Sequence, residues 1–145
     1  TMDDLFELRI TAMKLRKIYD MKCTEIMEKY ELRRADVDIL WLIYRSGNHK
    51  TARAIAETGM SKANISKSIE NLKINNLISL ETDKSDRRYV HIHLKTAAYA
   101  VIDEIIKVKT KINSDLLAGI SPEEKEIFKK IRNRLEHNIN TQYNF

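Results

Sequence analysis

Between residues 51 and 95 the spacing of apolar residues changes from three or four positions to two, and few folds accommodate that change. The wider spacing predicts a short helix over 52–58 and a longer helix over 62–75. Between them, Gly59 tolerates positive φ and Ser61 is a good helix N-cap, so we expect a tight corner there. Two helices joined by such a corner are typical of a helix-turn-helix.

The second part of this stretch predicts a β-hairpin. Apolar and polar residues alternate over 78–81 and again over 89–94. The connecting loop, Asp83-Lys84-Ser85-Asp86-Arg87-Arg88, is too long for a two-residue turn and is strongly charged. We expect this loop to project outward as the wing of a winged helix-turn-helix.

Long amphipathic helices are predicted on both sides of this stretch. One covers 4–30 and another 96–117. A third begins at Ser121, where a capping box is combined with proline at the first helical position, and runs to about 139 before a polar tail, 140–145. The apolar stripe of the first helix is too long for a small core to cover, so we expect it to pack against a long helix of another subunit.

These elements predict a mainly α fold of the α+β class, in one domain over 1–145. A helix over 35–45, which is apolar on nearly every side, should form the centre. We expect a winged helix-turn-helix region over 32–95, flanked by dimerisation helices over 4–30 and 96–140.

The charge distribution points to a polyanionic partner. The chain has a net charge of +5, and between Lys50 and Lys95 nine Lys or Arg stand against five Asp or Glu. A single cysteine excludes an intrachain disulfide and fits a reducing compartment, and no apolar run is long enough to span a membrane. We therefore expect a cytoplasmic protein with no membrane partner.

The face of the 62–75 helix that points away from the core carries small and hydrogen-bonding residues, which suit a helix that enters the major groove of DNA. That face comprises Ala63, Asn64, Ser66, Lys67, Glu70 and Asn71. We expect Asn64 and Lys67 to contact base edges. Phosphate contacts are expected from Ser61, Lys62 and Ser66.

The wing loop places two guanidinium groups, those of Arg87 and Arg88, at the tip of the hairpin. A guanidinium there can enter a narrow minor groove and gain from its negative potential. Asp86 is two residues before Arg88 and could hold that guanidinium in one pose. The alternative interpretation is a charged tip that only maintains solubility.

Residues 32–94 resemble the multiple antibiotic resistance regulator (MarR) family of winged helix-turn-helix transcriptional regulators. The resemblance is clearest in the wing, Asp86-Arg87-Arg88-Tyr89-Val90-His91-Ile92-His93-Leu94, and in the recognition helix, Met60-Ser61-Lys62-Ala63-Asn64-Ile65-Ser66-Lys67-Ser68-Ile69-Glu70-Asn71-Leu72. It implies an obligate homodimer in which the first helix and the last two interlock. It also implies that Arg88, supported by Asp86, contacts the minor groove.

We therefore expect a sequence-specific regulator that binds a pseudo-palindromic operator in double-stranded DNA as a homodimer, and that is a repressor released by a small aromatic or phenolic effector. Four aromatic residues could line an effector pocket between the dimer helices and the winged domain, although core packing is the favoured interpretation of them: Tyr19, Tyr30, Trp41 and Tyr44.

Other sites receive less weight. His91 and His93 have a spacing that could bind zinc, but the sequence offers no third ligand nearby, so we expect a solvated or phosphate-facing wing and neither a metal nor a cofactor. Cys23 shares the apolar stripe with Tyr19 and Ile26, which favours packing over a peroxide-sensing role.

An enzyme is not expected, because the chain lacks a glycine-rich phosphate loop, a nucleophile elbow and a histidine-containing catalytic motif. The alternative function is a winged-helix module that binds other proteins and not DNA. Duplex binding that weakens steeply with salt would separate the two.

Overall fold

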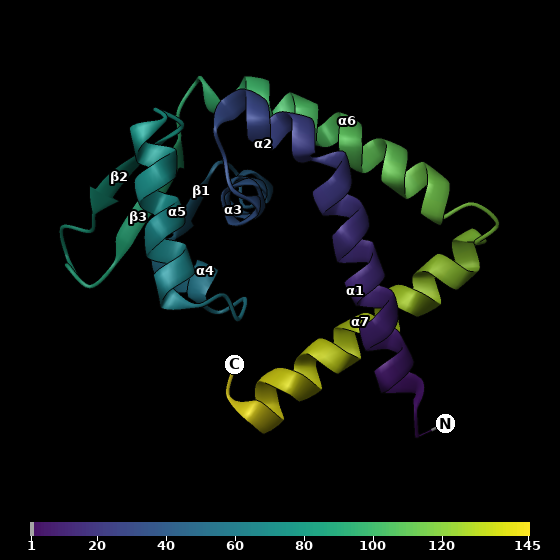
Figure 1. Cartoon of the computed structure of the whole chain (residues 1–145). Coiled ribbons are helices and arrows are strands. Elements are labelled where there is room, and N and C mark those ends of the chain that lie inside the picture. The colour runs from purple at the N-terminus through teal and green to yellow at the C-terminus, as the bar shows by residue number, and fades with distance from the viewer. Residues whose placement is uncertain (1) are drawn as a thin grey trace.

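The computed structural model describes residues 2–145, which form seven helices and a three-stranded sheet (Figure 1). In chain order the elements are α1 (Asp4–Lys22), α2 (Thr24–Tyr30), α3 (Arg34–Arg45), β1 (His49–Thr51), α4 (Ala52–Ala56), α5 (Lys62–Ile74), β2 (Ile78–Thr82), β3 (Val90–Leu94), α6 (Ala98–Leu116) and α7 (Pro122–Tyr143). The predicted mainly α class with a small sheet is confirmed.

The elements divide into a winged region and a set of long helices. Figure 1 shows α3, α4, α5 and the sheet grouped on one side, while α2 lies along α6 and α1 and α7 reach away from them. The sheet has the order β1-β3-β2, and both pairs of strands are antiparallel. The winged region is therefore held beside long helices that project beyond its core.

The core is centred on α3, as its apolar sequence predicts. Ile39, Leu40 and Ile43 of this helix have no exposed surface. They belong to one cluster with Leu72 of α5 and Ile105 of α6, so α3 joins the winged region to the long helices. Burying side chains of this size stabilises the fold by about 1.5–3 kcal/mol each.

The corner before α5 forms as its sequence predicts. Gly59 has a φ of +88°, which an L side chain rarely adopts, and the Oγ of Ser61 accepts a hydrogen bond from the backbone N–H of Asn64 at 3.2 Å. At the other end of α5, Asn76 takes a φ of +62° and lets the chain turn into β2.

The predicted single helix over 4–30 is wrong, because it is divided at Cys23. Figure 1 shows α1 and α2 running in different directions. The hydroxyl of Thr24 donates to the carbonyl oxygen of Asp20 at 3.1 Å, a side-chain interaction that bends helices. The bend lets α2 follow α6 while α1 leaves the core.

Two further predictions need correction. The strand β1 was not anticipated, because three residues are too few to show an alternating pattern. The polar tail expected after about residue 139 is helical as far as Tyr143, and Asn144, with a φ of 58°, ends the helix. The capping box at Ser121 and Glu124 is present as predicted.

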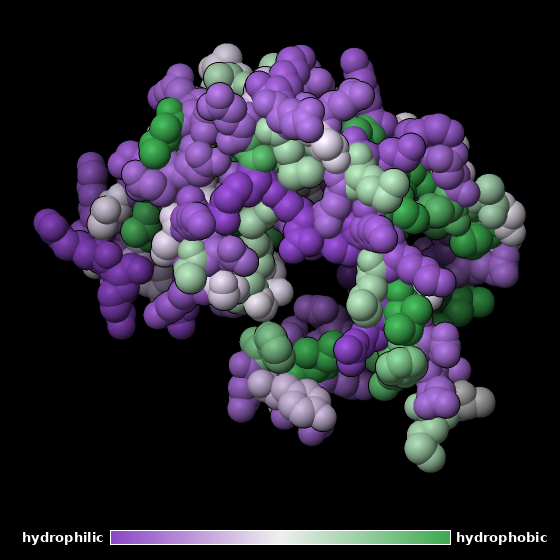
Figure 2. All heavy atoms as spheres, in the orientation of Figure 1, coloured by the Kyte–Doolittle hydropathy of each residue, from purple (hydrophilic) through white to green (hydrophobic). Residues whose placement is uncertain are grey.

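The long helices α1 and α7 leave apolar side chains uncovered. Neither helix contains a buried residue, and Figure 2 shows hydrophobic side chains gathered on both. These exposed side chains include Leu5, Phe6, Ile127, Phe128 and Ile131. None of the described helices is both long and apolar enough to cross a bilayer.

Candidate functional site

Helix α5 is anchored by one face and exposes the other. Ile65, Ser68 and Leu72 are buried against the core. The N-cap and the opposite face of α5 leave on the surface all the residues of this segment that were predicted to contact DNA, and these are Ser61, Lys62, Ala63, Asn64, Ser66 and Lys67. The side chains on this face are small or polar and include two lysines, which suits close approach to a nucleic-acid groove.

A buried polar network fixes α5 to the start of α3. The carboxylate of Asp36 has no exposed surface, and it accepts a hydrogen bond from the side-chain amide of Asn71 at 2.6 Å. The Arg33 guanidinium donates to the Ser68 hydroxyl at 2.8 Å. These bonds set the position of α5 relative to α3, in addition to the apolar contacts.

This network corrects one prediction and was not anticipated from the sequence. Asn71, expected on the outward face of α5, is half-buried and turned toward Asp36. Its partner lies 35 residues away, so helical periodicity alone could not reveal the contact. The one local signal was an aspartate three residues after Arg33, where its carboxylate accepts the Arg33 backbone N–H at 2.8 Å.

At the wing tip, Asp86 grips Arg88 with both carboxylate oxygens, as predicted. Oδ1 accepts from Arg88 Nε at 3.0 Å and Oδ2 accepts from Nη2 at 2.8 Å. The Arg88 side chain is 83% exposed, so it is oriented without being buried. The hydrogen bonds from Arg88 lower the pKa of Asp86 and those from Asp86 raise the pKa of Arg88.

The base of the wing loop is organised by Asp83. Its Oδ1 accepts from the Ser85 hydroxyl at 2.6 Å, from the Ser85 N–H at 2.8 Å and from the Asp86 N–H at 3.0 Å. The Ser85 hydroxyl, His91 and these backbone groups hold the pKa of Asp83 well below its usual range. Asp83 therefore remains ionised and fixes the backbone that carries Asp86 and Arg88.

The wing is also linked to α4. The Arg53 guanidinium donates to the Tyr89 hydroxyl at 3.1 Å and lies 5.6 Å from the centre of the Tyr89 ring. This contact ties a third arginine to Tyr89, the residue that follows the exposed Arg87 and Arg88 in the chain. Sequence reasoning missed Arg53, because its partner lies 36 residues further along the chain.

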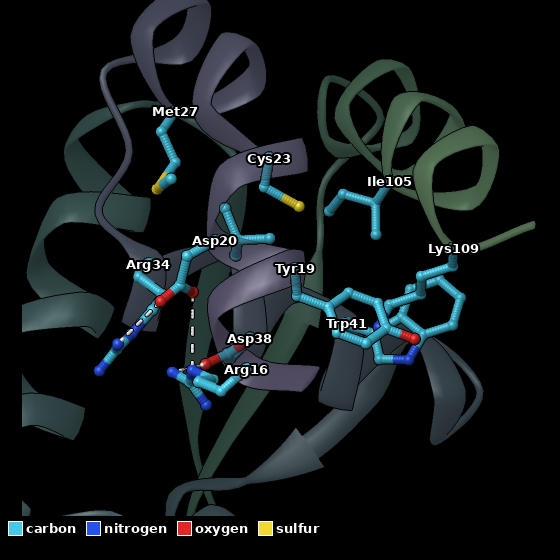
Figure 3. Close-up of a pocket in the computed structure, with 11 residues that line it drawn as sticks. Arg16, Tyr19, Asp20, Cys23, Met27, Arg34, Asp38, Trp41, Ile105 and Lys109 are labelled. Carbon is cyan, nitrogen blue, oxygen red and sulfur yellow. Dashed lines mark hydrogen bonds and ion pairs between the residues drawn. The ribbon is translucent and has the colours of Figure 1, made fainter. Parts of the chain in front are cut away.

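A pocket opens between α1, α2, α3 and α6 (Figure 3). Its lining comprises Arg16, Tyr19, Asp20, Cys23, Met27, Arg34, Val37, Asp38, Trp41, Ile105 and Lys109. Of the four aromatic residues predicted for an effector pocket, Tyr19 and Trp41 line this one. Tyr44 packs against Trp41, with ring centres 5.4 Å apart. Tyr30 lies elsewhere and donates its hydroxyl proton to Glu104.

The two ends of the pocket differ in charge pairing. At one end Arg16 contacts Asp38 at 2.7 Å and Arg34 contacts Asp20 at 3.0 Å. At the other end the Lys109 ammonium lies 4.5 Å from the ring centre of Tyr19 and 4.8 Å from that of Trp41. Within residues 2–145 the structure shows no carboxylate in ion-pair contact with Lys109. Burial lowers the pKa of Lys109, so an anion placed beside it would stabilise its charged form.

Cys23 lines the pocket as a buried thiol, 7% exposed. Burial is the main cause that raises its pKa, with the positive charge of Lys109 acting in the opposite direction. The thiol is therefore kept protonated, in agreement with the packing interpretation of this residue.

Comparison with known proteins identifies a protein family whose sequence model matches this chain and solved structures that share its fold. The family described as "Transcriptional regulator SarA/Rot" matches residues 22–105. The structure is similar to a MarR protein from Peptoclostridium difficile, with 18% identity and a TM-score of 0.79 over 97% of this chain and 89% of that one. These matches confirm the predicted MarR-type winged-helix fold.

Two similar structures have titles that mention small molecules. One is BpsR of Bordetella bronchiseptica, whose DNA binding is described as regulated by 6-hydroxynicotinic acid, with 19% identity and a TM-score of 0.70 over 92% of each chain. The other is the organohalide-sensing regulator RdhR in its 2,4-dichlorophenol-bound form, with 20% identity and a TM-score of 0.68 over 97% of this chain and 83% of that one.

Proposed function

The chain belongs to the SarA/Rot family of transcriptional regulators, and from this premise we propose that it binds a pseudo-palindromic operator as a homodimer and blocks transcription there. The observation that carries the proposal is the pairing of an exposed, polar α5 face with a wing whose Arg88 is held by Asp86. One element suits a major groove and the other a minor groove.

In this proposal α5 reads sequence in the major groove. The Asn64 side-chain amide is suited to bidentate pairing with adenine, and the Lys67 ammonium to the acceptors of guanine. Ala63 is small enough to let the helix approach closely, while Ser61, Lys62 and Ser66 contact phosphates near the start of the helix. The phosphate contacts fix the register of the protein on the duplex, and the base contacts give sequence specificity.

The wing contacts the adjacent minor groove. Arg88 enters that groove in the pose that Asp86 sets, and the exposed Arg87 lies against the phosphate backbone. Because the Asp86 pair orders the guanidinium before DNA arrives, less conformational entropy is lost on binding.

Homodimer formation is supported by the apolar side chains that α1 and α7 leave exposed. Phe128 is 62% exposed and Ile131 56%, although both are large and apolar. A second copy that packs on these helices would cover them and set two copies of α5 about 34 Å apart, one turn of DNA. Such a dimer would act in the cytoplasm.

The pocket that Tyr19 and Trp41 line supports a response to a small aromatic or phenolic effector. Two flat rings and the ammonium of Lys109 offer stacking surfaces and a positive charge to a phenolate or a carboxylate. An effector that binds better to dimers with misplaced α5 helices would release DNA by shifting the population.

Selection of bound duplexes from random DNA tests the proposal. We expect an enriched palindrome with half-sites about one helical turn apart, bound with an affinity that falls steeply as salt rises. Binding without salt dependence, or no enrichment of any sequence, would contradict the proposal and favour a module that binds other proteins.

A further inference from the structure

Arg34, the first residue of α3, lies between two depressions in the protein surface. One is the pocket of Figure 3, where Arg34 is at the end opposite Lys109. The other, the α5 hollow, is lined by Asp20, Met27, Arg33, Arg34, Ala35 and Asn64. Asp20, Met27 and Arg34 line both depressions, so they form the wall that separates the pocket from the α5 hollow.

One side of α5 faces the start of α3. Asn64, Ser68 and Asn71 are spaced by four and three residues, so they lie along the same side of the helix. Asn71 donates to Asp36 and Ser68 accepts from Arg33, which fixes two of the three against α3. Asn64 is one turn closer to the start of α5 and lines the α5 hollow. The residue proposed to read a base edge is therefore separated from the start of α3 by this hollow.

The two arginines of the α5 hollow have different surroundings. Arg33 donates to Asp36 and Ser68, within the network that fixes α5. The Arg34 side chain is 55% exposed, and its Nη1 donates to Asp20 Oδ2 at 3.0 Å. A guanidinium has five N–H donors, so Nη2 and Nε of Arg34 can bind another acceptor while Nη1 stays paired.

A duplex bound by α5 would bring phosphates to the α5 hollow. A helix in the major groove lies between the two phosphate rows that border the groove. The row on the Asn64 side of α5 would pass the start of α3, where the Arg34 guanidinium and the positive end of the helix dipole both favour an anion.

We propose that Arg34 is a further DNA contact, which donates to a backbone phosphate beside the base that Asn64 reads, and that Asp20 restrains it by competing for the same guanidinium. This inference rests on the proposed DNA-binding function. Because Arg34 also lines the pocket, an anion bound there would compete with the phosphate in the same way. The pocket and the DNA-reading helix are therefore coupled through one side chain.

The first test compares two arginine variants in their binding to a duplex selected from random DNA. Arg16→Ala is the matched control, since Arg16 lines the pocket and pairs with Asp38 of α3 but is not among the residues that line the α5 hollow. We expect Arg34→Ala to bind about three- to tenfold more weakly, with a salt slope smaller by about one, and Arg16→Ala to match wild type. Wild-type affinity and slope in Arg34→Ala would overturn the proposal.

Asp20→Asn gives a result that a purely structural ion pair would not give. If the pair only held α1 to α3, breaking it from either side would weaken DNA binding. We expect Asp20→Asn instead to bind about two- to threefold more tightly, because Arg34 is released toward the phosphate. Asp38→Asn, which removes the carboxylate paired with Arg16, should leave the affinity unchanged. Weaker binding by Asp20→Asn would overturn the restraint.

The double variant shows whether Asp20 acts through Arg34 or only through its negative charge. In an Arg34→Ala background we expect Asp20→Asn to have no effect on the affinity, since the residue that it restrains is absent. The same increase with and without Arg34 would mean that the charge of Asp20 acts on DNA directly, which would contradict the proposed competition.

Arg88→Ala separates a failure of this inference from a failure of the proposed function. If wild type binds no duplex in a salt-dependent manner, both are wrong. If Arg88→Ala weakens binding and Arg34→Ala does not, the function stands and the inference alone is wrong. The side chains of Arg34 and Asp20 are both partly exposed, so we expect each variant to fold, and urea denaturation measures this.

Discussion

Replacing Asp36 with alanine removes a fully buried carboxylate that joins the start of α3 to α5. That carboxylate accepts hydrogen bonds from Asn71 Nδ2 at 2.6 Å, from the Arg33 N–H at 2.8 Å and from Arg33 Nη2 at 3.3 Å. Without it, the Asn71 amide keeps only a 3.3 Å hydrogen bond to the Glu31 carbonyl oxygen, while the Arg33 guanidinium, 35% exposed, keeps its bond to Ser68. Leaving a buried donor without its main acceptor costs about 1–3 kcal/mol, a substantial part of the roughly 5–15 kcal/mol that typically stabilises a small protein.

The expected loss can be measured by urea denaturation, followed by circular dichroism at neutral pH. Asp38→Ala is the control, since Asp38 lies on the same helix with a side chain 39% exposed and its ion pair with Arg16 is worth about 1 kcal/mol or less. Asp36→Asn retains an acceptor oxygen and should lie between the two. If Asp36→Ala loses no more stability than Asp38→Ala, the network does not hold α5 as described.

Two further predictions concern the pocket and the long helices. Because burial raises the pKa of Cys23, alkylation of the native protein at neutral pH should be at least about tenfold slower than after unfolding, and equal rates would contradict the buried, protonated thiol. Phe128→Glu introduces a charge on the exposed apolar face of α7, so sedimentation should show a shift from dimer toward monomer, while Lys129→Glu beside it should remain dimeric; a dimer unaffected by Phe128→Glu would place the interface elsewhere.

Local signals in the sequence were sufficient for several parts of the site. Ser61 caps α5 three residues from its partner, and Asp86 holds Arg88 two residues away, so both contacts could be predicted from spacing. The fold class could also be predicted from local patterns, since hydrophobic periodicity indicates which face of each helix or strand is buried.

Contacts between distant segments were not accessible in this way. Asn71 turns inward because it donates a hydrogen bond to Asp36, which lies 35 residues earlier in the chain. His49 lies within hydrogen-bond distance of His91, 42 residues later, and it belongs to a strand that is too short to predict. His91 and His93 were expected on a solvated or phosphate-facing wing, and the structure adds two partners that the sequence did not suggest, Asp83 for His91 and Glu81 for His93. Such pairings depend on the register of the sheet, which the alternation of apolar residues does not fix between non-consecutive strands.

The most direct test of DNA recognition by the wing and α5 is the affinity of Arg88→Ala for a selected duplex over a range of salt concentrations. Lys130→Ala, which removes a positive charge on α7, is the control. We expect Arg88→Ala to bind about tenfold or more weakly, with a salt slope smaller by about one, and Lys130→Ala to match wild type. If Arg88→Ala binds with the wild-type affinity and slope, the wing does not contact DNA and the account is wrong.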